Sequence, residues 1–338
     1  MPRCTVLMPV YNCEPYLAAA IQSILDQTFP DFHLLIVDDG STDHSPEIAS
    51  AFADARITVV RNETNQGIVA ALNRGLAAIQ TEYIARMDGD DLAVPDRLAR
   101  QIETMDAHPE IGLCGGEVAR FHPDGTSQGV QPWMRPLTHT AIQFQLLFHN
   151  PICHITVMLR RSVMAHHGLT YSAQYPYAED YELWTRLGQR TRLANIPQLL
   201  ARYRLHSDSS SARHRTEQRR SRWLIRLQQA SYLGMPIPTE EQILYQALLD
   251  RQFVGDGREL TVARRHLDAI GRAGVRQLDQ PRRLVLTWLN AYWFSACSRS
   301  SGSRLAAWAL YCSRLYGWAG PPHRIGALLK RCIRGRNV

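Results

Sequence analysis

The chain of 338 residues contains a single lysine, Lys330, and the residue directly before it is Leu329 and not glycine. A phosphate-binding loop of the G-x-x-x-x-G-K-[ST] type is therefore absent, which excludes a P-loop nucleotide hydrolase. The first strand-like run continues into Tyr11-Asn12-Cys13-Glu14 and not into G-x-G-x-x-G, so the dinucleotide-binding fingerprint is missing too. The seven cysteines include no C-x-x-C pair. This argues against a disulfide framework and a zinc site, and favours reduced thiols in a cytoplasm.

The sequence also lacks a run of about 18 consecutive apolar residues, so it predicts no membrane-spanning helix. The nearest approach, residues 284–296, is interrupted by Thr287, Asn290 and Ser295. The first residues lead straight into a strand-like stretch without the apolar segment of a secretory leader. We therefore expect a cytoplasmic protein, either free or peripherally attached to the cytoplasmic face of the inner membrane.

The first hundred residues alternate between short apolar runs and amphipathic segments. Runs such as 5–10 and 34–37 are continuously apolar, as expected for strands that are buried on both faces of a parallel sheet. Between them lie helical segments such as 67–79, whose apolar residues share one face. This alternation predicts an α/β fold with a Rossmann-like, mostly parallel sheet and helices on both faces.

Two acidic clusters directly follow predicted strands: Asp38-Asp39, and the segment Asp88-Gly89-Asp90-Asp91. Ligands bind at the carboxyl ends of the strands in such sheets, so both clusters are expected at one rim. Carboxylates at that rim suit Mg²⁺ or Mn²⁺, which would neutralise a departing diphosphate. The alternative is that the segment 88–91 only forms a turn, with Asp91 capping the next helix.

Four segments in sequence order strongly resemble the family 2 glycosyltransferases: TVLMPVYNCEPYLAAAIQSILDQTF, LLIVDDGSTD, NQGIVAALNRGLAAIQTEYIARMDGDD and YAEDYELWTRL. The resemblance extends from Thr5 to Ser211. It implies a GT-A fold, a nucleoside diphosphate sugar as donor, and an inverting transfer. It also divides the chain into a GT-A catalytic domain over 1–211, a linker over 212–222 and a basic, all-helical C-terminal region over 223–338.

The resemblance places the donor at the carboxyl ends of the first strands. Pro9 and Tyr11 are expected to border the nucleobase, with Tyr11 stacked on it. Asp39 would accept an N–H from a uracil or thymine ring, which favours a UDP- or dTDP-sugar. The alternatives are a strand-end aromatic for Tyr11 and a turn-forming residue for Asp39. The remaining expected residues are Asn73, Asp88 and Gly89 at the donor, and Asp90, Asp88 and His206 at a Mg²⁺ or Mn²⁺ ion.

The pair Glu179-Asp180 resembles the family's catalytic E-D element, in which the aspartate is the general base. An acceptor hydroxyl has a very high pKa, so a carboxylate must take its proton as the new bond forms, a contribution of typically ~10²–10⁴-fold. Trp184, about one helical turn beyond Asp180, and His154 are expected to contact the acceptor. The structural alternatives are a helix N-terminal carboxylate for Asp180, a core position for Trp184, and non-catalytic histidines at 154 and 206.

The resemblance thus predicts a metal-dependent glycosyltransferase that extends a glycan or a lipid-linked acceptor in surface polysaccharide synthesis. Two alternatives remain. A catalytically inactive binding or scaffold protein could keep this fold, although the intact set Asp88, Asp90 and Asp180 argues against it. A nucleotidyltransferase would share the rim and the metal, but the glycine- and lysine-rich loop typical of that chemistry does not follow the first strand.

The basic residues gather in the C-terminal part. Residues 1–215 carry 23 acidic and 18 basic side chains, whereas residues 216–338 carry 8 and 20. One interpretation is a helical subdomain that buries its aromatic residues, and the other is a basic amphipathic surface on an anionic membrane. No nucleic-acid-binding motif is present, so a nucleic-acid partner is not expected. The aromatic and basic residues concerned are Trp288, Tyr292, Trp293, Trp308, Tyr311, Tyr316 and Trp318, with Arg299, Arg304, Arg314, Arg324 and Arg331.

Overall fold

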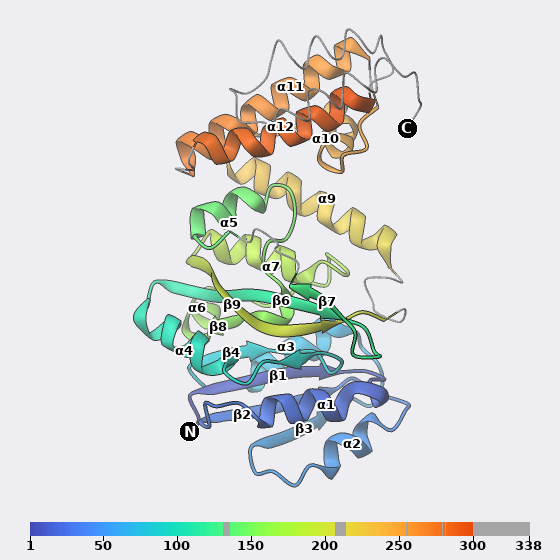
Figure 1. Ribbon diagram of the computed structural model, residues 1–338, viewed down its shortest axis with the longest axis vertical. Helices are drawn as coiled ribbons and strands as arrows, with labels where there is room; N and C mark the ends of the chain where they lie inside the picture. The colour runs from blue at the N-terminus through green and yellow to red at the C-terminus, as the bar shows by residue number, and fades with distance from the viewer. Residues whose placement is uncertain (131–135, 207–213, 255, 279, 281, 300–338) are drawn as a thin grey trace. The chain divides into compact units, whose positions relative to one another are not determined.

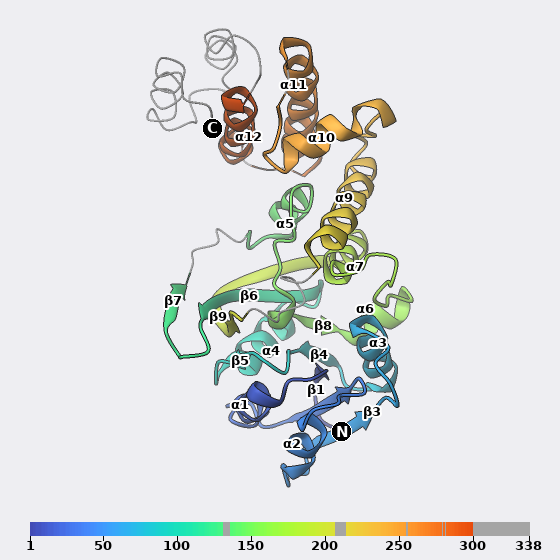
Figure 2. The same ribbon diagram turned by 90° about the vertical axis from the view of Figure 1, so that its right-hand side faces the viewer.

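A computed structural model describes residues 1–130, 136–206, 214–254, 256–278, 280 and 282–299 (Figures 1 and 2). The chain divides into two compact units, Met1–Ile225 and Arg226–Val338. The expected domain end at Ser211 lies outside the described residues. Residues 215–222, expected as a linker, form the first turns of helix α9, Arg215–Tyr232.

The N-terminal unit is built on one sheet with strand order β3-β2-β1-β4-β8-β6-β9-β5, and β7 pairs with β6. The α/β class is confirmed. The expected parallel arrangement holds for β3-β2-β1-β4 and for the pair β6–β9, whereas β8 runs antiparallel to β4 and β6, so the second half is mixed. The strands are β1 Cys4–Val10, β2 Phe32–Asp38, β3 Ile57–Arg61, β4 Tyr83–Arg86, β5 Leu92–Ala93, β6 Ile111–Phe121, β7 Ser127–Val130, β8 Met158–Arg160 and β9 Arg192–Arg204.

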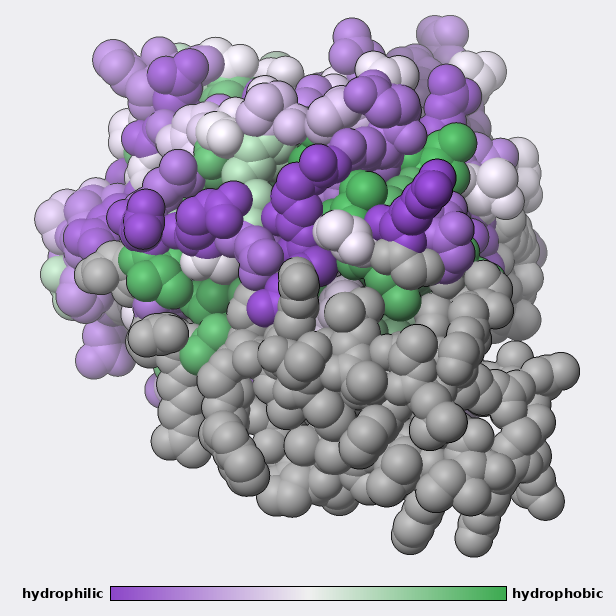
Figure 3. Space-filling model, turned by 90° about the horizontal axis from the view of Figure 1, so that it is seen from above, coloured by the Kyte–Doolittle hydropathy of each residue, from purple (hydrophilic) through white to green (hydrophobic). Residues whose placement is uncertain are grey.

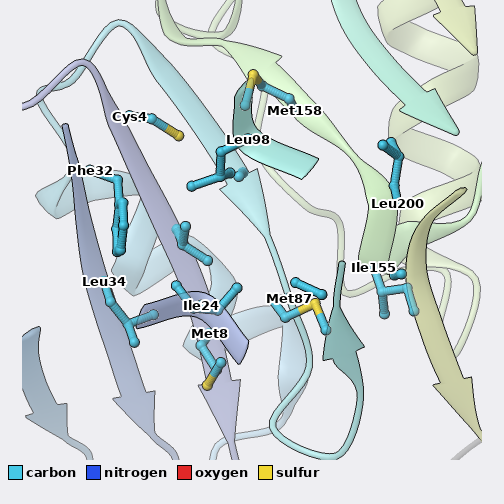
Figure 4. Packing of buried hydrophobic residues seen from close by; sticks show 14 of the residues in the cluster. Cys4, Met8, Ile24, Phe32, Leu34, Met87, Leu98, Ile155, Met158 and Leu200 are labelled. Atoms are coloured by element: carbon cyan, nitrogen blue, oxygen red, sulfur yellow. The ribbon is translucent and has the colours of Figure 1, made fainter. Parts of the chain in front are cut away.

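Helices cover both faces of this sheet. Alternate strand residues point to opposite sides, so the apolar side chains of a strand need cover on both faces. Met8 packs on one face with residues of α1 and α4 (Figure 4), while its neighbour Leu7 packs on the other face with residues of α3, α6 and α7. Burial on both faces explains why β1 and β2 are continuously apolar. The helices of this unit are α1 Glu14–Leu25, α2 Ser45–Ala51, α3 Ile68–Ala78, α4 Arg97–Ala107, α5 His139–Gln145, α6 Arg161–His166 and α7 Glu179–Gly188, with the short 3₁₀ helix η1 His154–Thr156.

The sheet register brings the polar loops to one edge. Val10 at the end of β1 pairs with Asp38 at the end of β2, and Leu7 pairs with Arg86 at the end of β4. The residues that follow these three parallel strands, including Asp39 and Asp88, therefore leave the sheet at the same rim.

The described part of the C-terminal unit is helical, as expected. It contains η2 Thr239–Glu241, α10 Gln242–Leu249, α11 Gly257–Arg272, η3 Ala273–Gln277 and α12 Arg282–Arg299. Tyr292 and Trp293 are buried in it, which confirms the structural interpretation for these two aromatic residues. Among the described residues, no helix combines the length and the apolar character needed to cross a membrane. Trp308, Tyr311, Tyr316 and Trp318, with Arg304, Arg314, Arg324 and Arg331, lie outside the described residues.

Candidate active site

The turn after β1 is fixed by the turn after β2. Asn12 adopts a positive φ of 52°, and its side-chain oxygen accepts a hydrogen bond of 2.9 Å from the Thr42 amide. In return, the hydroxyl of Ser41 accepts the Asn12 amide at 3.0 Å. This leaves the ring of Tyr11 at the surface, 45% exposed, where it is able to stack on a planar ligand. Pro9, by contrast, is buried within β1 and offers no exposed side chain.

The carboxylate of Asp39 accepts hydrogen bonds from the segment that precedes α3. Its carboxylate accepts hydrogen bonds from the Asn62 side chain at 2.6 Å, from the Gln66 amide at 3.0 Å and from the Gly67 amide at 2.8 Å. An ionised carboxylate has about four acceptor positions, so about one remains for a ligand. Asp39 therefore holds this loop at the rim of the sheet and keeps about one acceptor position for a ligand.

The Asp88-Gly89-Asp90-Asp91 loop packs closely against the end of β1. A Cβ added to Gly89 would lie 3.2 Å from Val10 Cγ2 and 3.4 Å from Cys13 Sγ. The glycine is therefore explained by close approach, and its φ is not positive. Asp91 does not cap the next helix, because the N-cap of α4 is Asp96.

The end of β9 holds this acidic loop in place. The backbone amide of Arg204 donates to Asp91 Oδ1 at 2.6 Å, and its Nε donates to the Asp90 carbonyl at 2.7 Å. The guanidinium of Arg204 also lies over the ring of Tyr16, at 4.6 Å from its centroid. Next to it, Nε2 of His206 lies 2.9 Å from Asp90 Oδ2. The structure thus brings His206 to Asp90, as the resemblance implied.

Arg86 is a site residue that the sequence analysis did not select. It is 5% exposed and forms a two-pronged ion pair with Asp88, in which Nη1 donates to Oδ2 at 2.6 Å and Nη2 donates to Oδ1. Its positive charge also acts on Asp91, Glu179 and Asp180. An arginine that ends a buried apolar strand, two residues before Asp88, was the sequence signal for this role.

Asp180 and Glu179 lie in the first turn of α7. The Asn150 side chain donates to Asp180 Oδ2 at 2.8 Å, and the Tyr181 amide donates to Asp180 Oδ1 at 2.6 Å. Glu179 is 8% exposed, and its buried Oε2 has no hydrogen-bond partner. The two neighbouring carboxylates therefore differ: one has a fixed donor on each oxygen, and the other has a buried oxygen without one.

Three expected ligand-contacting residues are engaged inside the protein. Trp184 is fully buried, and its ring packs edge-on against His154 at a centroid distance of 5.7 Å, so it belongs to the core and does not line an open acceptor site. His154 Nε2 lies 2.8 Å from the Tyr171 hydroxyl. Asn73 pairs its side-chain amide with the backbone of Tyr171, donating to the carbonyl and accepting from the N–H at 2.9 Å each, so the amide is anchored to this segment of the chain.

The carboxylates act on one another across the two elements. Burial raises the pKa of Asp88 to about 6; Arg86 opposes this, and the charges of Asp90 and Asp180 add to it. Burial, reinforced by the charge of Asp180, raises the pKa of Glu179 to about 7. Burial also raises the pKa of Asp180, against the Tyr181 amide and Arg86. Asp180 is thus within electrostatic reach of Asp88, although the two residues come from distant parts of the chain.

The acidic loop offers a donor set that suits a hard divalent cation. Asp88, Asp90 and Asp91 each present a carboxylate oxygen within 4.8 Å of the others. Asp91 Oδ2 is buried without a hydrogen-bond partner, and burial raises the pKa of this carboxyl well above its usual value. Carboxylate oxygens with one imidazole suit Mg²⁺ or Mn²⁺, so the residues present fit such an ion.

Comparisons with known proteins identify the family. The model for Glycosyl transferase family 2 matches residues 5–168. An uncharacterised glycosyltransferase of Haemophilus influenzae is 32% identical over 246 residues, which cover 68% of this chain and 74% of the relative. The amylovoran biosynthesis glycosyltransferase AmsE of Erwinia amylovora is 32% identical over 214 residues, covering 62% and 79%. The chain therefore belongs to the family 2 glycosyltransferases. It is a glycosyltransferase, as expected, and not a nucleotidyltransferase.

A further relative and two solved structures are also similar. The Escherichia coli enzyme WfgD, a UDP-Glc:α-D-GlcNAc-diphosphoundecaprenol β-1,3-glucosyltransferase, is 28% identical over 221 residues, covering 65% of this chain and 83% of WfgD. Staphylococcus aureus TarS 1–349, crystallised with UDP, has a TM-score of 0.56 at 14% identity, covering 99% and 92%. The Pyrobaculum calidifontis mannosyltransferase PcManGT, with GDP-Man and Mn²⁺, has a TM-score of 0.52 at 17% identity, covering 99% and 88%. These two structures confirm the GT-A-like fold.

Proposed function

We propose that this glycosyltransferase moves a sugar from a UDP- or dTDP-sugar onto a glycan or lipid-linked acceptor, with inversion at the anomeric carbon. The observation that carries the proposal is the position of Asp180, whose carboxylate is held by Asn150 and is within electrostatic reach of the acidic loop. A base beside a diphosphate site is the arrangement that single-displacement transfer requires.

In this proposal, Asp180 accepts the proton of the acceptor hydroxyl while the oxygen of that hydroxyl forms the new bond to the anomeric carbon. The bond from that carbon to the nucleoside diphosphate breaks at the opposite side, and the diphosphate leaves with its electron pair. Asp90, Asp88 and His206 would hold Mg²⁺ or Mn²⁺, which supplies charge neutralisation to the leaving group when bound. Tyr11 stacks on the nucleobase, and Asp39 uses its remaining acceptor position for a base N–H.

The donor preference is tested by a thermal-shift screen of UDP, GDP, dTDP and CMP, each with and without Mn²⁺. We expect UDP or dTDP to raise the unfolding temperature, and to do so more strongly when Mn²⁺ is present. Stabilisation by GDP or CMP alone would contradict the assigned donor, and equal shifts without the cation would contradict the metal site.

The acceptor class is supported by the relatives. WfgD acts on a sugar linked to diphosphoundecaprenol, and AmsE belongs to amylovoran biosynthesis. We infer a similar place for this chain in surface polysaccharide synthesis at the cytoplasmic face of the membrane. Radiolabelled sugar transferred from the donor found in the screen to a lipid-extractable product is the expected result. Label confined to water-soluble free sugar would contradict a lipid-linked acceptor.

Contact with an anionic membrane is proposed for the C-terminal unit. Arg258, Arg265 and Arg272 are exposed on α11 at intervals of seven residues, so they share one helix face. In the view from above, hydrophilic residues with hydrophobic residues between them make up the coloured surface (Figure 3). Replacing Arg258 and Arg272 by glutamate should weaken sedimentation with phosphatidylglycerol vesicles, and unchanged sedimentation would contradict the contact.

A further inference from the structure

Asn150 links Asp180 to a turn that lies thirty residues earlier in the chain. Its Nδ2 donates to Asp180 Oδ2 at 2.8 Å, while its Oδ1 accepts the Ile152 amide at 3.1 Å. The second contact determines which way the amide points, because a backbone N–H requires an acceptor. The nitrogen, and not the oxygen, must therefore face Asp180.

The turn that carries Asn150 is itself anchored. The residue that follows is Pro151, which restricts Asn150 to extended backbone conformations. The Asn195 side chain on β9 donates to the Pro151 carbonyl at 3.3 Å, and Ile152 is 1% exposed in the core. Asn150 is therefore held on both sides while it contacts the carboxylate.

We propose that Asn150 is a positioning residue that holds the Asp180 carboxylate, in its ionised form, at a fixed orientation for proton transfer. The proposal rests on the assignment of Asp180 as the base. An amide nitrogen is suited to this role, because it donates to the carboxylate and has no basic lone pair that would compete for the proton. With Asn150 on Oδ2 and the Tyr181 amide on Oδ1, each oxygen keeps a free acceptor position for the hydroxyl.

Other charged groups also act on Asp180 and contribute, together with Asn150, to the pKa of its carboxyl group. A hydrogen bond to the ionised form lowers the pKa of a carboxyl group, as do nearby cations, while burial and nearby anions raise it. The groups around Asp180 are Arg86 and Asp88 at the end of β4, Arg222 on α9, the phenol of Tyr171, and Glu179 on α7. Asn150 is a neutral donor, so replacing it by alanine removes a hydrogen bond without changing the net charge.

The test is a pH titration of the Asp180 carboxyl by NMR in metal-free protein labelled with ¹³Cγ-aspartate, with the signal assigned from the Asp180→Asn spectrum. Asn150→Ala should raise the midpoint by about one pH unit. Asn150→Asp, which keeps the side-chain volume and adds a negative charge, should raise it further. Gln22→Ala, which removes a side-chain amide that donates to the carboxylate of Asp26 at 2.7 Å, is the matched control and should leave the midpoint in place.

An unchanged midpoint in a folded Asn150→Ala protein would overturn the proposal. If Asn150→Ala does not fold, the same result in Asn150→Asp overturns it. The base assignment is tested separately, by measuring sugar transfer in Asp180→Asn. Retained transfer in that variant means that the proposed function is wrong at this residue, whereas lost transfer with an unmoved titration means that only the role of Asn150 is wrong.

Discussion

Arg86 grips the carboxylate of Asp88 with both terminal nitrogens of its guanidinium, in a pair where Arg86 is almost fully buried. Burial alone would disfavour the ionised carboxylate, and the neighbouring charges of Asp90 and Asp180 would disfavour it further. Arg86 offsets these effects. It thereby keeps one carboxylate of the acidic loop oriented, and it reduces repulsion among the acidic groups around it.

Removing this cation should therefore be costly. Arg86→Gln removes the buried partner of the partly buried Asp88, and breaking an ion pair with a buried member typically destabilises a protein by about 3–5 kcal/mol. Urea unfolding of the metal-free protein measures the loss. The matched control is Arg56→Gln, which breaks the partly exposed pair with Asp54 and should cost about 1 kcal/mol or less. Equal losses in the two variants would contradict the role assigned to Arg86.

Asp180→Asn should reduce sugar transfer by about 10²–10⁴-fold, because the amide cannot accept the hydroxyl proton. Binding of UDP with Mn²⁺, measured by calorimetry, should stay close to the wild-type value, since Asp180 is not assigned to the donor. Asp124→Asn in the turn between β6 and β7 is the control and should transfer normally. Full activity in Asp180→Asn would remove this residue as the base.

The raised pKa of Glu179 predicts how the stability of the folded protein depends on pH. Its pKa is about 7 in the folded protein against a usual 4.5, so the folded state binds the proton more tightly. Its contribution to the free energy of unfolding is therefore present below about pH 4.5 and lost as the pH rises towards 7. Glu179→Gln should gain stability relative to wild type between pH 5 and 8 in EDTA. A constant difference across that range in chemical denaturation would contradict this.

Gly40 should be harder to replace than another glycine with the same backbone preference. Its φ is +73°, and an added Cβ would lie 2.6 Å from the backbone carbon of Thr64. Gly125 has a φ of +84° but nothing within 4 Å of that position. Gly125→Ala therefore reports only the backbone strain, about 1 kcal/mol, and Gly40→Ala should exceed it in thermal unfolding. Similar losses would show that the Thr64 contact is easily relieved.

Local patterns in the sequence predicted the strands and the rim. The apolar runs of β1 and β2 indicated burial on both faces, and the acidic residues after β2 and β4 indicated a shared edge. Contacts between distant segments were not visible in this way. Asn73 was expected at the donor, but its amide pairs with the backbone of Tyr171, ninety-eight positions away. The hydrogen bond from Asn150 to Asp180 likewise depends on how two separate loops meet.

The sequence pattern also did not decide between core and surface for an aromatic residue on a short helix. Trp184 lies one turn after Asp180, so its spacing allowed both an acceptor contact and a core position. The packing of α7 against His154 and Tyr171 decided for the core. Arg86 was overlooked because the strand around it is apolar, and its importance depends on its ion pair with Asp88.

In the proposed function, the acidic loop holds a divalent cation that binds the donor diphosphate beside Asp180. Crystals grown with UDP and Mn²⁺, and measured at the manganese absorption edge, test it most directly. We expect one anomalous peak within about 2.2 Å of an Asp90 carboxylate oxygen, in contact with the diphosphate, with the Asp180 side chain turned towards the same site. A peak away from Asp88 and Asp90 with UDP bound elsewhere, or Asp180 turned away from the diphosphate, would contradict it.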